Sequence, residues 1–176
     1  MFDHNFNLSM KSRLLVMGIM TAVILTVVNV EIASKERIVR DGTIVLLRIA
    51  PRDPRSLLQG DYMALRYTMV DDVAREAKQS DLDDGVAIIE LDEHNEATFV
   101  ALYDGQPLEP GQHLLRYRKR GESVRLGSDA YFFEEGTGED YSSARFGEIR
   151  LNAKGDSVLT GLRDESGEPL GRSLHI

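Results

Sequence analysis

The chain has 176 residues and a formal charge of −8 at pH 7, with 21 Lys and Arg against 29 Asp and Glu. It contains no cysteine, which excludes disulfides, thiol catalysis, thiolate metal sites and a cysteine-linked lipid anchor. Because residues 1–13 carry +1 (Lys11 and Arg13 against Asp3), the remainder carries −9 and repels phosphate backbones, so nucleic acid is not expected as a partner.

Residues 14–30 form an uncharged run of 17 residues, LLVMGIMTAVILTVVNV. As a helix this run would be about 25 Å long, slightly short of a hydrocarbon core of about 30 Å. Flanking residues lengthen it, so the sequence predicts a transmembrane helix over 14–32 after a cytoplasmic tail over 1–13. Two alternatives stay open: a cleaved signal peptide, although Val30–Ser34 is a poor cleavage site, and a buried core helix, although core helices are rarely apolar all round.

Basic residues flank this run on both sides and do not by themselves favour one orientation: Lys11 and Arg13 precede it, and Lys35, Arg37 and Arg40 follow it. A long domain after a membrane helix crosses the bilayer largely regardless of its charges. We therefore expect a single-pass protein with a cytoplasmic N-terminus and an exported domain.

Small residues recur every four positions along the predicted helix, at Gly18, Ala22 and Thr26. Such a strip allows two helices to approach closely, so it is a candidate packing surface for a partner helix or for a second copy of this chain. Membrane helices contain many small residues in general, and this simpler interpretation stays open.

A charged juxtamembrane linker over 33–42 leads to the predicted domain over 43–176. Residues 43–50 are almost continuously apolar, which predicts a buried, central strand. The next predicted strand, 62–69, alternates at period two, with one face formed by Met63, Leu65, Tyr67 and Met69. Its opposite face carries Tyr62, Ala64, Arg66 and Thr68.

The rest of the domain reads as short strands joined by turns. A helix of about two turns is predicted after Asp71-Asp72, with an Asp as its N-cap. Strands are predicted over 86–91, 97–103, 113–119, 123–126, 130–133, 148–151 and 158–162, with an irregular Gly-rich stretch over 134–145. Two hairpins are expected among them, one formed by 86–91 with 97–103 and one by 148–151 with 158–162. The fold class is therefore mostly β, a curled sheet or partly open barrel with one short helix after the N-terminal membrane helix.

The segment Gly60–Tyr67, GDYMALRY, matches all five fixed letters of the GDYXXLXY signature: Gly60, Asp61, Tyr62, Leu65 and Tyr67. With the preceding helix, the segment Asp53-Pro54-Arg55 and the later run Glu135–Gly138, the chain resembles the GDYXXLXY family over nearly its whole length. The resemblance implies a bacterial protein anchored in the cytoplasmic (inner) membrane, with an exported periplasmic domain that accompanies a multispanning membrane protein.

A weaker resemblance links the chain to type I signal peptidases, which also have a membrane anchor followed by an exported β-fold. Ser56–Asp61 looks like the second half of their nucleophile segment, and the stretch from Tyr131 to Arg145 is similar to a later one. The position that matches the nucleophile is Arg52, which cannot attack a carbonyl. The resemblance thus implies a signal-peptidase-like fold without the protease chemistry.

Candidate binding residues are Asp61 and Tyr62 in the signature, and Glu135 and Arg145 in the Gly-rich stretch. Asp61 is also expected to cap a turn, and Tyr67 to lie in the core. Carboxylates and an arginine in one loop suit a ligand rim, but the set Glu134, Glu135, Asp140 and Arg145 suits a closed salt-bridge network better. A further candidate is the basic strand face of Arg116, Arg118 and Arg120, which would lie against anionic lipid or an acidic partner unless it is simply solvated.

Catalytic and metal-binding patterns are weak. Ser56, Ser142 and Ser143 have no nucleophile motif, and a Ser-Lys pair would need Lys119 beside one of them. The histidines lack paired spacing, and Asp81–Gly85 is more typical of a turn than of a calcium loop, so we expect no metal and no cofactor. The leading hypothesis is an accessory or scaffold protein for a multispanning membrane partner; the alternatives are a signal-peptidase-like hydrolase and a ligand-binding envelope sensor.

Overall fold

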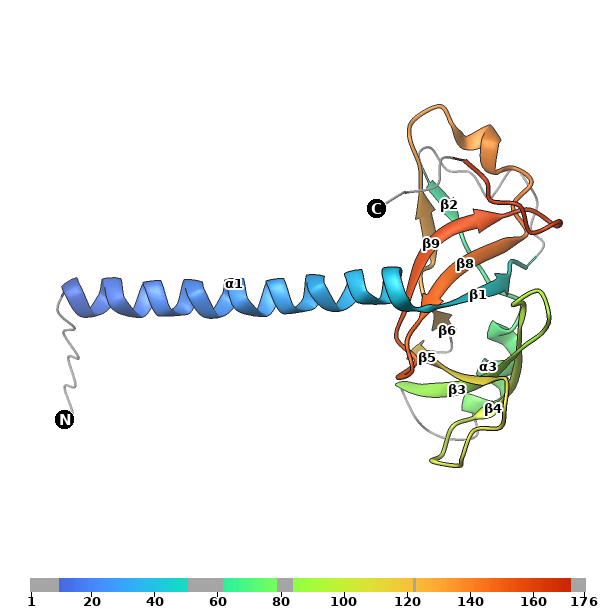
Figure 1. Cartoon of the computed structure of the whole chain (residues 1–176), viewed down its shortest axis with the longest axis horizontal. Coiled ribbons are helices and arrows are strands. Elements are labelled where there is room, and N and C mark those ends of the chain that lie inside the picture. The colour runs from blue at the N-terminus through green and yellow to red at the C-terminus, as the bar shows by residue number, and fades with distance from the viewer. Residues whose placement is uncertain (1–9, 51–61, 79–83, 122, 172–176) are drawn as a thin grey trace. The chain divides into compact units, whose positions relative to one another are not determined.

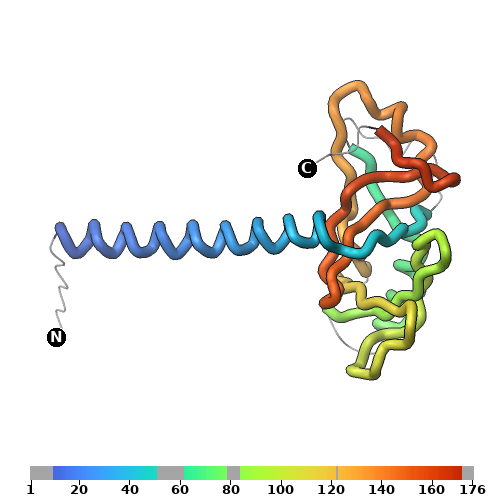
Figure 2. Tube along the Cα trace, viewed as in Figure 1, coloured from blue at the N-terminus to red at the C-terminus, as the bar shows by residue number. Residues whose placement is uncertain are grey.

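The structure is a computed structural model that describes residues 10–50, 62–78, 84–121 and 123–171. The chain divides into two units, residues 1–37 and 38–176. The first unit contains most of helix α1 (Met10–Asp41). The second is a mostly β domain, a curled half-barrel of strands with the short helix α3 (Val70–Ala77) (Figures 1 and 2). The predicted fold class is confirmed.

Helix α1 is longer than the predicted membrane segment. It begins in the predicted tail and continues to Asp41, so the stretch over 33–42 is helical almost to its end. The helix stops at Gly42, whose N–H donates to the carbonyl of Ile38 at 2.9 Å. A Cβ at position 42 would collide with that same carbonyl oxygen, so only glycine fits this exit without rearrangement.

Within the described residues, nine strands form three antiparallel sheets, with orders β1-β8-β9, β2-β7 and β4-β3-β5-β6. The two predicted hairpins, β3–β4 and β8–β9, are confirmed, and β5 and β6 form a third. The strand bounds are β1 Thr43–Arg48, β2 Tyr62–Ala64, β3 Asp84–Leu91, β4 Ala97–Leu102, β5 Gln112–Arg120, β6 Ser123–Leu126, β7 Ala130–Phe132, β8 Phe146–Leu151 and β9 Ser157–Arg163.

The prediction that the first strand is central is wrong, because β1 lies at the end of its sheet. Its outer side is nevertheless occupied. The N–H of Leu46 donates to the carbonyl of Asn95 at 2.8 Å, and Ile49 forms an isolated bridge with Tyr67. These contacts bury the three consecutive residues Val45–Leu47. The apolar run therefore indicates correctly that β1 is buried, but it does not indicate where β1 lies in the sheet.

Where the structure describes the strands, their register shifts at two bulges. One lies between Ile88 and Ile89 in the β3–β4 pair, and the other between Glu148 and Ile149 in the β8–β9 pair. A bulge adds one residue to one strand and increases the local twist. At the second bulge the additional residue is Thr160, whose hydroxyl donates to the Glu148 carboxylate at 2.9 Å. This hydrogen bond holds the bulge in place.

Helix α3 packs against β4 and β6 and has the predicted length of about two turns. The predicted Asp cap is wrong, because the N-cap is Met69 and no side chain accepts a hydrogen bond there. Asp71 and Asp72 lie inside the first turn instead, and Asp71 pairs with Arg66. Their negative charges still favour the helix N-terminus electrostatically.

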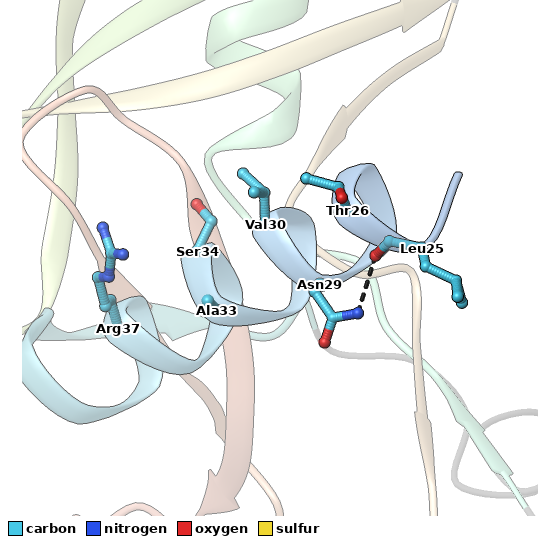
Figure 3. A pocket seen from close by; sticks show the side chains of 7 residues that line it. All are labelled: Leu25, Thr26, Asn29, Val30, Ala33, Ser34 and Arg37. Carbon is cyan, nitrogen blue, oxygen red and sulfur yellow. Dashed lines mark hydrogen bonds between the residues drawn. The ribbon is translucent and has the colours of Figure 1, made fainter. Parts of the chain in front are cut away.

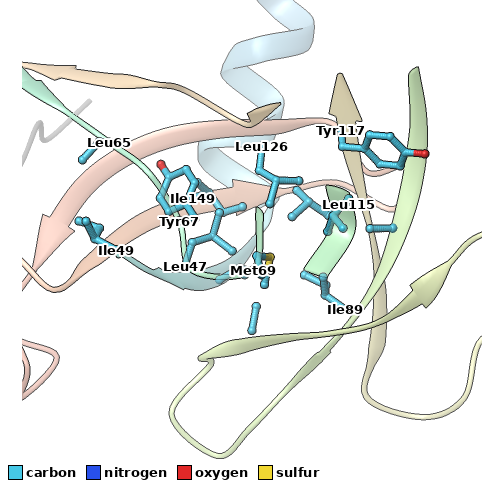
Figure 4. Packing of buried hydrophobic residues seen from close by; sticks show 14 of the residues in the cluster. Leu47, Ile49, Leu65, Tyr67, Met69, Ile89, Leu115, Tyr117, Leu126 and Ile149 are labelled. Atoms are coloured by element: carbon cyan, nitrogen blue, oxygen red, sulfur yellow. The ribbon is translucent and has the colours of Figure 1, made fainter. Parts of the chain in front are cut away.

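The core draws side chains from all three sheets (Figure 4). The predicted alternation of the signature strand is confirmed: Met63, Leu65, Tyr67 and Met69 are buried, whereas Arg66 and Thr68 are exposed. The residues labelled in Figure 4 are Leu47, Ile49, Leu65, Tyr67, Met69, Ile89, Leu115, Tyr117, Leu126 and Ile149.

Three tyrosine rings occupy places where a glycine in another segment leaves room for them. A Cβ at Gly147 in β8 would lie 2.9 Å from Cε1 of the buried Tyr67, which is closer than van der Waals contact allows. The two other glycines are blocked in the same way by a tyrosine ring. The pairs are Tyr67 with Gly147, Tyr117 with Gly85, and Tyr141 with Gly171.

Candidate functional site

The apolar part of helix α1 is exposed in the part of the chain that the structure describes. Each residue from Leu14 to Val30 is exposed, and none of the most apolar 18-residue stretch is buried. The helix is long and apolar enough to cross a membrane. Exposed apolar surface of this extent is costly in water, so the helix needs lipid or another protein around it.

One face of this helix is slightly hollowed because its side chains are small or polar (Figure 3). The polar groups within the hollow bond to their own helix: the Thr26 hydroxyl donates to the carbonyl of Ala22 and the Asn29 amide to that of Leu25, both at 2.8 Å. Such bonds lower the cost of placing these side chains in hydrocarbon. The hollow is lined by Leu25, Thr26, Asn29, Val30, Ala33, Ser34 and Arg37.

The predicted packing strip of Gly18, Ala22 and Thr26 lies on α1, and all three residues are exposed. Nothing lies within 4 Å of the place where a Gly18 Cβ would be. The strip is thus open along the helix, and its role in packing stays a prediction.

The signature strand uses its two faces differently. Tyr67 is 2 % exposed, and its hydroxyl donates to the Ser128 carbonyl at 3.2 Å. Burial is the main cause that raises the pKa of Tyr67 well above its usual range. Leu65 is also buried, so packing accounts for both residues. Tyr62 is half-buried on the opposite face, as the alternation predicts, and Asp61 lies outside the described residues.

The outer face of the β2–β7 ribbon carries an aromatic pair, the half-buried Tyr62 and the exposed Phe132. The two residues lie opposite each other in the register, and their ring centroids are 5.6 Å apart. Phe132 is 74 % exposed, whereas no other large hydrophobic residue described in the domain exceeds the 42 % of Val100. Sequence reasoning did not select Phe132. The signal was available, since its position opposite Tyr62 follows once β2 and β7 are paired.

The inner face of the same ribbon is filled by a tyrosine cluster. Tyr141, in the 3₁₀ turn η1 (Gly138–Tyr141), lies 5.3 Å from Tyr131 and 5.1 Å from Phe133, measured between ring centroids. Burial, together with the neighbouring Tyr141, raises the pKa of Tyr131 to about 12. Because residues 131 and 133 fill the inner side, Phe132 must point outward.

The salt-bridge network predicted in the Gly-rich stretch does not form. Arg145 reaches Glu165 at 3.9 Å instead of Glu134, Glu135 or Asp140. Within the described residues these three carboxylates make no ion pair, and all are exposed. Glu134, Glu135 and Asp140 are therefore solvated carboxylates in the stretch that follows β7.

An ion cluster around Arg48 was not predicted. The Arg48 guanidinium donates to Glu96 through two nitrogens, at 2.7 and 3.0 Å, and to Glu165 at 3.1 Å. It also lies 4.5 Å from the centre of the Phe146 ring. The hydrogen bond to Glu96 is the main cause that raises the pKa of Arg48 above its usual range. This cluster joins β1, the β3–β4 turn and the chain after β9, which is a structural role.

The basic strand face forms as predicted, because Arg116, Arg118 and Arg120 are all exposed on β5. It is partly neutralised, however. Arg116 pairs with Asp156 at 2.9 Å, and Asp84 lies opposite Arg118 in the register. Contact with lipid or a partner stays a prediction for this face.

Catalytic geometry is weak where the structure describes it. The Ser142 hydroxyl donates to the carbonyl of Glu139 at 2.8 Å and so completes the η1 turn. Across the described ranges, no three His, Asp or Glu residues group to hold a metal ion. Arg52 and Ser56, on which the signal-peptidase comparison depends, lie outside those ranges, as does most of the run Asp81–Gly85.

Comparison with known proteins supplies the family. The family model described as GDYXXLXY protein matches residues 24–162, which include the second half of α1 and nearly all of the β-domain. Neither the curated proteins nor the solved structures contain a match to this sequence. With most of its length covered by that family model, the chain belongs to the GDYXXLXY protein family.

Proposed function

We propose that this protein is a single-pass membrane-anchored accessory protein, whose exported β-domain binds a multispanning membrane protein. The observation that carries the proposal is the apolar surface of α1, exposed over all 17 residues from Leu14 to Val30. A bilayer covers such a helix at little cost. The anchor holds the domain at the bacterial cytoplasmic membrane, with the N-terminus in the cytoplasm.

The exposed surface of the domain also suits binding better than catalysis. Some of its charged side chains pair to brace strands, as Arg48 does with Glu96 and Arg163 with Glu148. Its most exposed aromatic residue, Phe132, lies next to the signature residue Tyr62. Along α1, the strip at Gly18, Ala22 and Thr26 supplies a second surface, suited to a partner's membrane helix.

Orientation is tested by cysteine labelling, for which this chain is well suited because it contains no cysteine of its own. Glu109→Cys places a thiol in the exposed loop before β5. We expect a membrane-impermeant maleimide to label it in cells whose outer membrane alone has been opened. Labelling only after the inner membrane is lysed would contradict an exported domain, and release of the protein by alkaline carbonate would contradict the anchor.

Partner binding is tested by affinity purification from gently solubilised membranes. We expect a multispanning protein to be recovered with the wild type and to be reduced with Ala22→Leu, which fills the helix strip. Val23→Leu is the matched control, since it also enlarges an exposed apolar side chain but lies about 100° around the helix. Recovery of the protein alone at every detergent concentration would contradict the proposal.

A further inference from the structure

Phe132, the exposed member of the aromatic pair on the outer ribbon face, does not pack in the hydrophobic core. Tyr131 and Phe133 already fill the inner side through their contacts with Tyr141. Tyr62 covers only part of the Phe132 ring, which stays 74 % exposed. Large aromatic side chains exposed to this degree are typical of binding surfaces, where they act as anchors.

Two carboxylates follow this pair closely in the chain. Glu134 and Glu135 come two and three residues after Phe132, the last residue of β7. Both are exposed, and within the described chain neither forms an ion pair. Glu139 and Asp140 lie on the η1 turn, whose Tyr141 packs against the inner side of the ribbon, so they do not belong to this surface. The surface is therefore an aromatic centre with an acidic rim formed by Glu134 and Glu135.

The combination of negative charge and aromatic surface determines which kind of side chain can bind here. A Lys or Arg side chain is attracted both by the face of an aromatic ring and by neighbouring carboxylates. Anionic lipid headgroups and a second copy of the same surface would both bring negative charge against the rim. We infer that Tyr62 and Phe132, with the rim formed by Glu134 and Glu135, bind a segment of the membrane partner that carries an Arg or Lys beside an apolar residue.

The inference rests on the proposed function, and cross-linking of the full-length protein in native membranes tests both. Phe132 is replaced by the photoreactive residue p-benzoylphenylalanine, and Leu108, which is 40 % exposed in a different loop, serves as the control position. We expect an adduct with a multispanning protein from position 132, at least tenfold stronger than from position 108. Mass spectrometry of the adduct should place an Arg or Lys within about five residues of the attachment point, which is the reach of a neighbouring side chain in an extended segment.

Charge reversal separates the rim from the ring. Glu134→Lys with Glu135→Lys should reduce the adduct from position 132 at least fivefold. The matched control is Glu93→Lys with Glu109→Lys, which makes the same change in net charge at two exposed carboxylates elsewhere and should alter the yield less than twofold. All four residues are exposed, so both variants are expected to fold, and circular dichroism in detergent checks this.

The outcomes distinguish the two proposals. If a multispanning protein is recovered by affinity purification but position 132 gives no adduct with it, the inference is overturned and the proposed function stands. If neither is obtained, both fall. An adduct with lipid, an adduct only with this chain itself, or an adduct that the Glu134 and Glu135 reversal leaves unchanged also overturns the inference.

Discussion

Substitution of Gly147 by alanine gives the sharpest test of how the signature tyrosine is held. The added methyl group would lie 2.9 Å from Cε1 and 3.1 Å from the hydroxyl oxygen of Tyr67, and 3.4 Å from a methyl group of Leu159. Tyr67 is 2 % exposed and its hydroxyl is bonded to Ser128, so the ring has little room to move away. Overpacking of this kind costs about 1–3 kcal/mol of the free energy of unfolding.

The matched control is Gly161→Ala in the neighbouring strand β9, where nothing lies within 4 Å of the added methyl group. Both substitutions reduce the entropy of the unfolded chain to a similar extent, so their difference isolates the contact with Tyr67. At roughly 4 °C per kcal/mol for a domain of this size, we expect the Tm of Gly147→Ala to lie about 4–12 °C below that of Gly161→Ala. Thermal unfolding of the full-length protein in detergent, followed by far-ultraviolet circular dichroism, measures this.

A double-mutant cycle identifies the cause. Tyr67→Leu removes the atoms that the new methyl group would meet, so in that background Gly147→Ala should cost less than about 0.5 kcal/mol. The coupling between the two positions should then be at least about 1 kcal/mol. Equal Tm values for Gly147→Ala and Gly161→Ala, or additive effects of Tyr67→Leu and Gly147→Ala, would refute the reasoning.

Two further predictions concern charge. Arg48→Lys replaces a guanidinium that contacts both Glu96 and Glu165 and should cost about 1 kcal/mol of stability. Arg75→Lys, in a more exposed pair with Asp72, should cost less than about 0.5 kcal/mol. Urea unfolding compares the two variants, and equal losses would refute a special role for the Arg48 cluster. The pKa of Asp92 is lowered chiefly by the hydrogen bond from the Glu96 N–H, and the pKa of Asp164 chiefly by the hydrogen bond from the Ser166 hydroxyl. The stability that these two carboxylates add to the fold is therefore present above the usual carboxyl pKa of about 3.9 and is lost as pH falls below it. The Tm advantage of the wild type over Asp92→Asn with Asp164→Asn should therefore shrink between pH 5 and pH 2, and an advantage that does not change with pH would contradict this sign.

The alternating part of the domain could be predicted from the sequence because its signal is local. Residues 62–69 alternate between apolar and polar, and a strand with one buried face must place Met63, Leu65, Tyr67 and Met69 on the same side. The same reasoning gave the hairpins, since each turn lies between two strands that are adjacent in the chain. The apolar pattern of a strand determines which of its faces are buried, but it does not determine whether the strand lies at the centre or the edge of a sheet. For this reason the continuous apolar run of β1 led to the wrong position in the sheet.

The side-chain partners of the candidate site could not be predicted, because they depend on residues far apart in the sequence. Arg48 is separated from Glu96 by 48 positions and from Glu165 by 117 positions. Arg145 has nearer carboxylates along the chain and still reaches Glu165, because the fold and not the sequence interval sets the distance. The Asp cap of α3 failed for a local reason, since the helix begins at Val70, before Asp71, and Asp71 pairs with Arg66.

The pairing of tyrosine rings with glycines constrains the order in which substitutions at these positions can accumulate during evolution. Enlarging Gly147 first creates a collision with Tyr67, whereas shrinking Tyr67 first leaves a void, which a later Gly147→Ala would begin to fill. The same asymmetry applies to Tyr117 with Gly85 and to Tyr141 with Gly171. Viable lineages should therefore lose the ring before they lose the glycine, and a single-position library at any of these glycines should return almost only glycine.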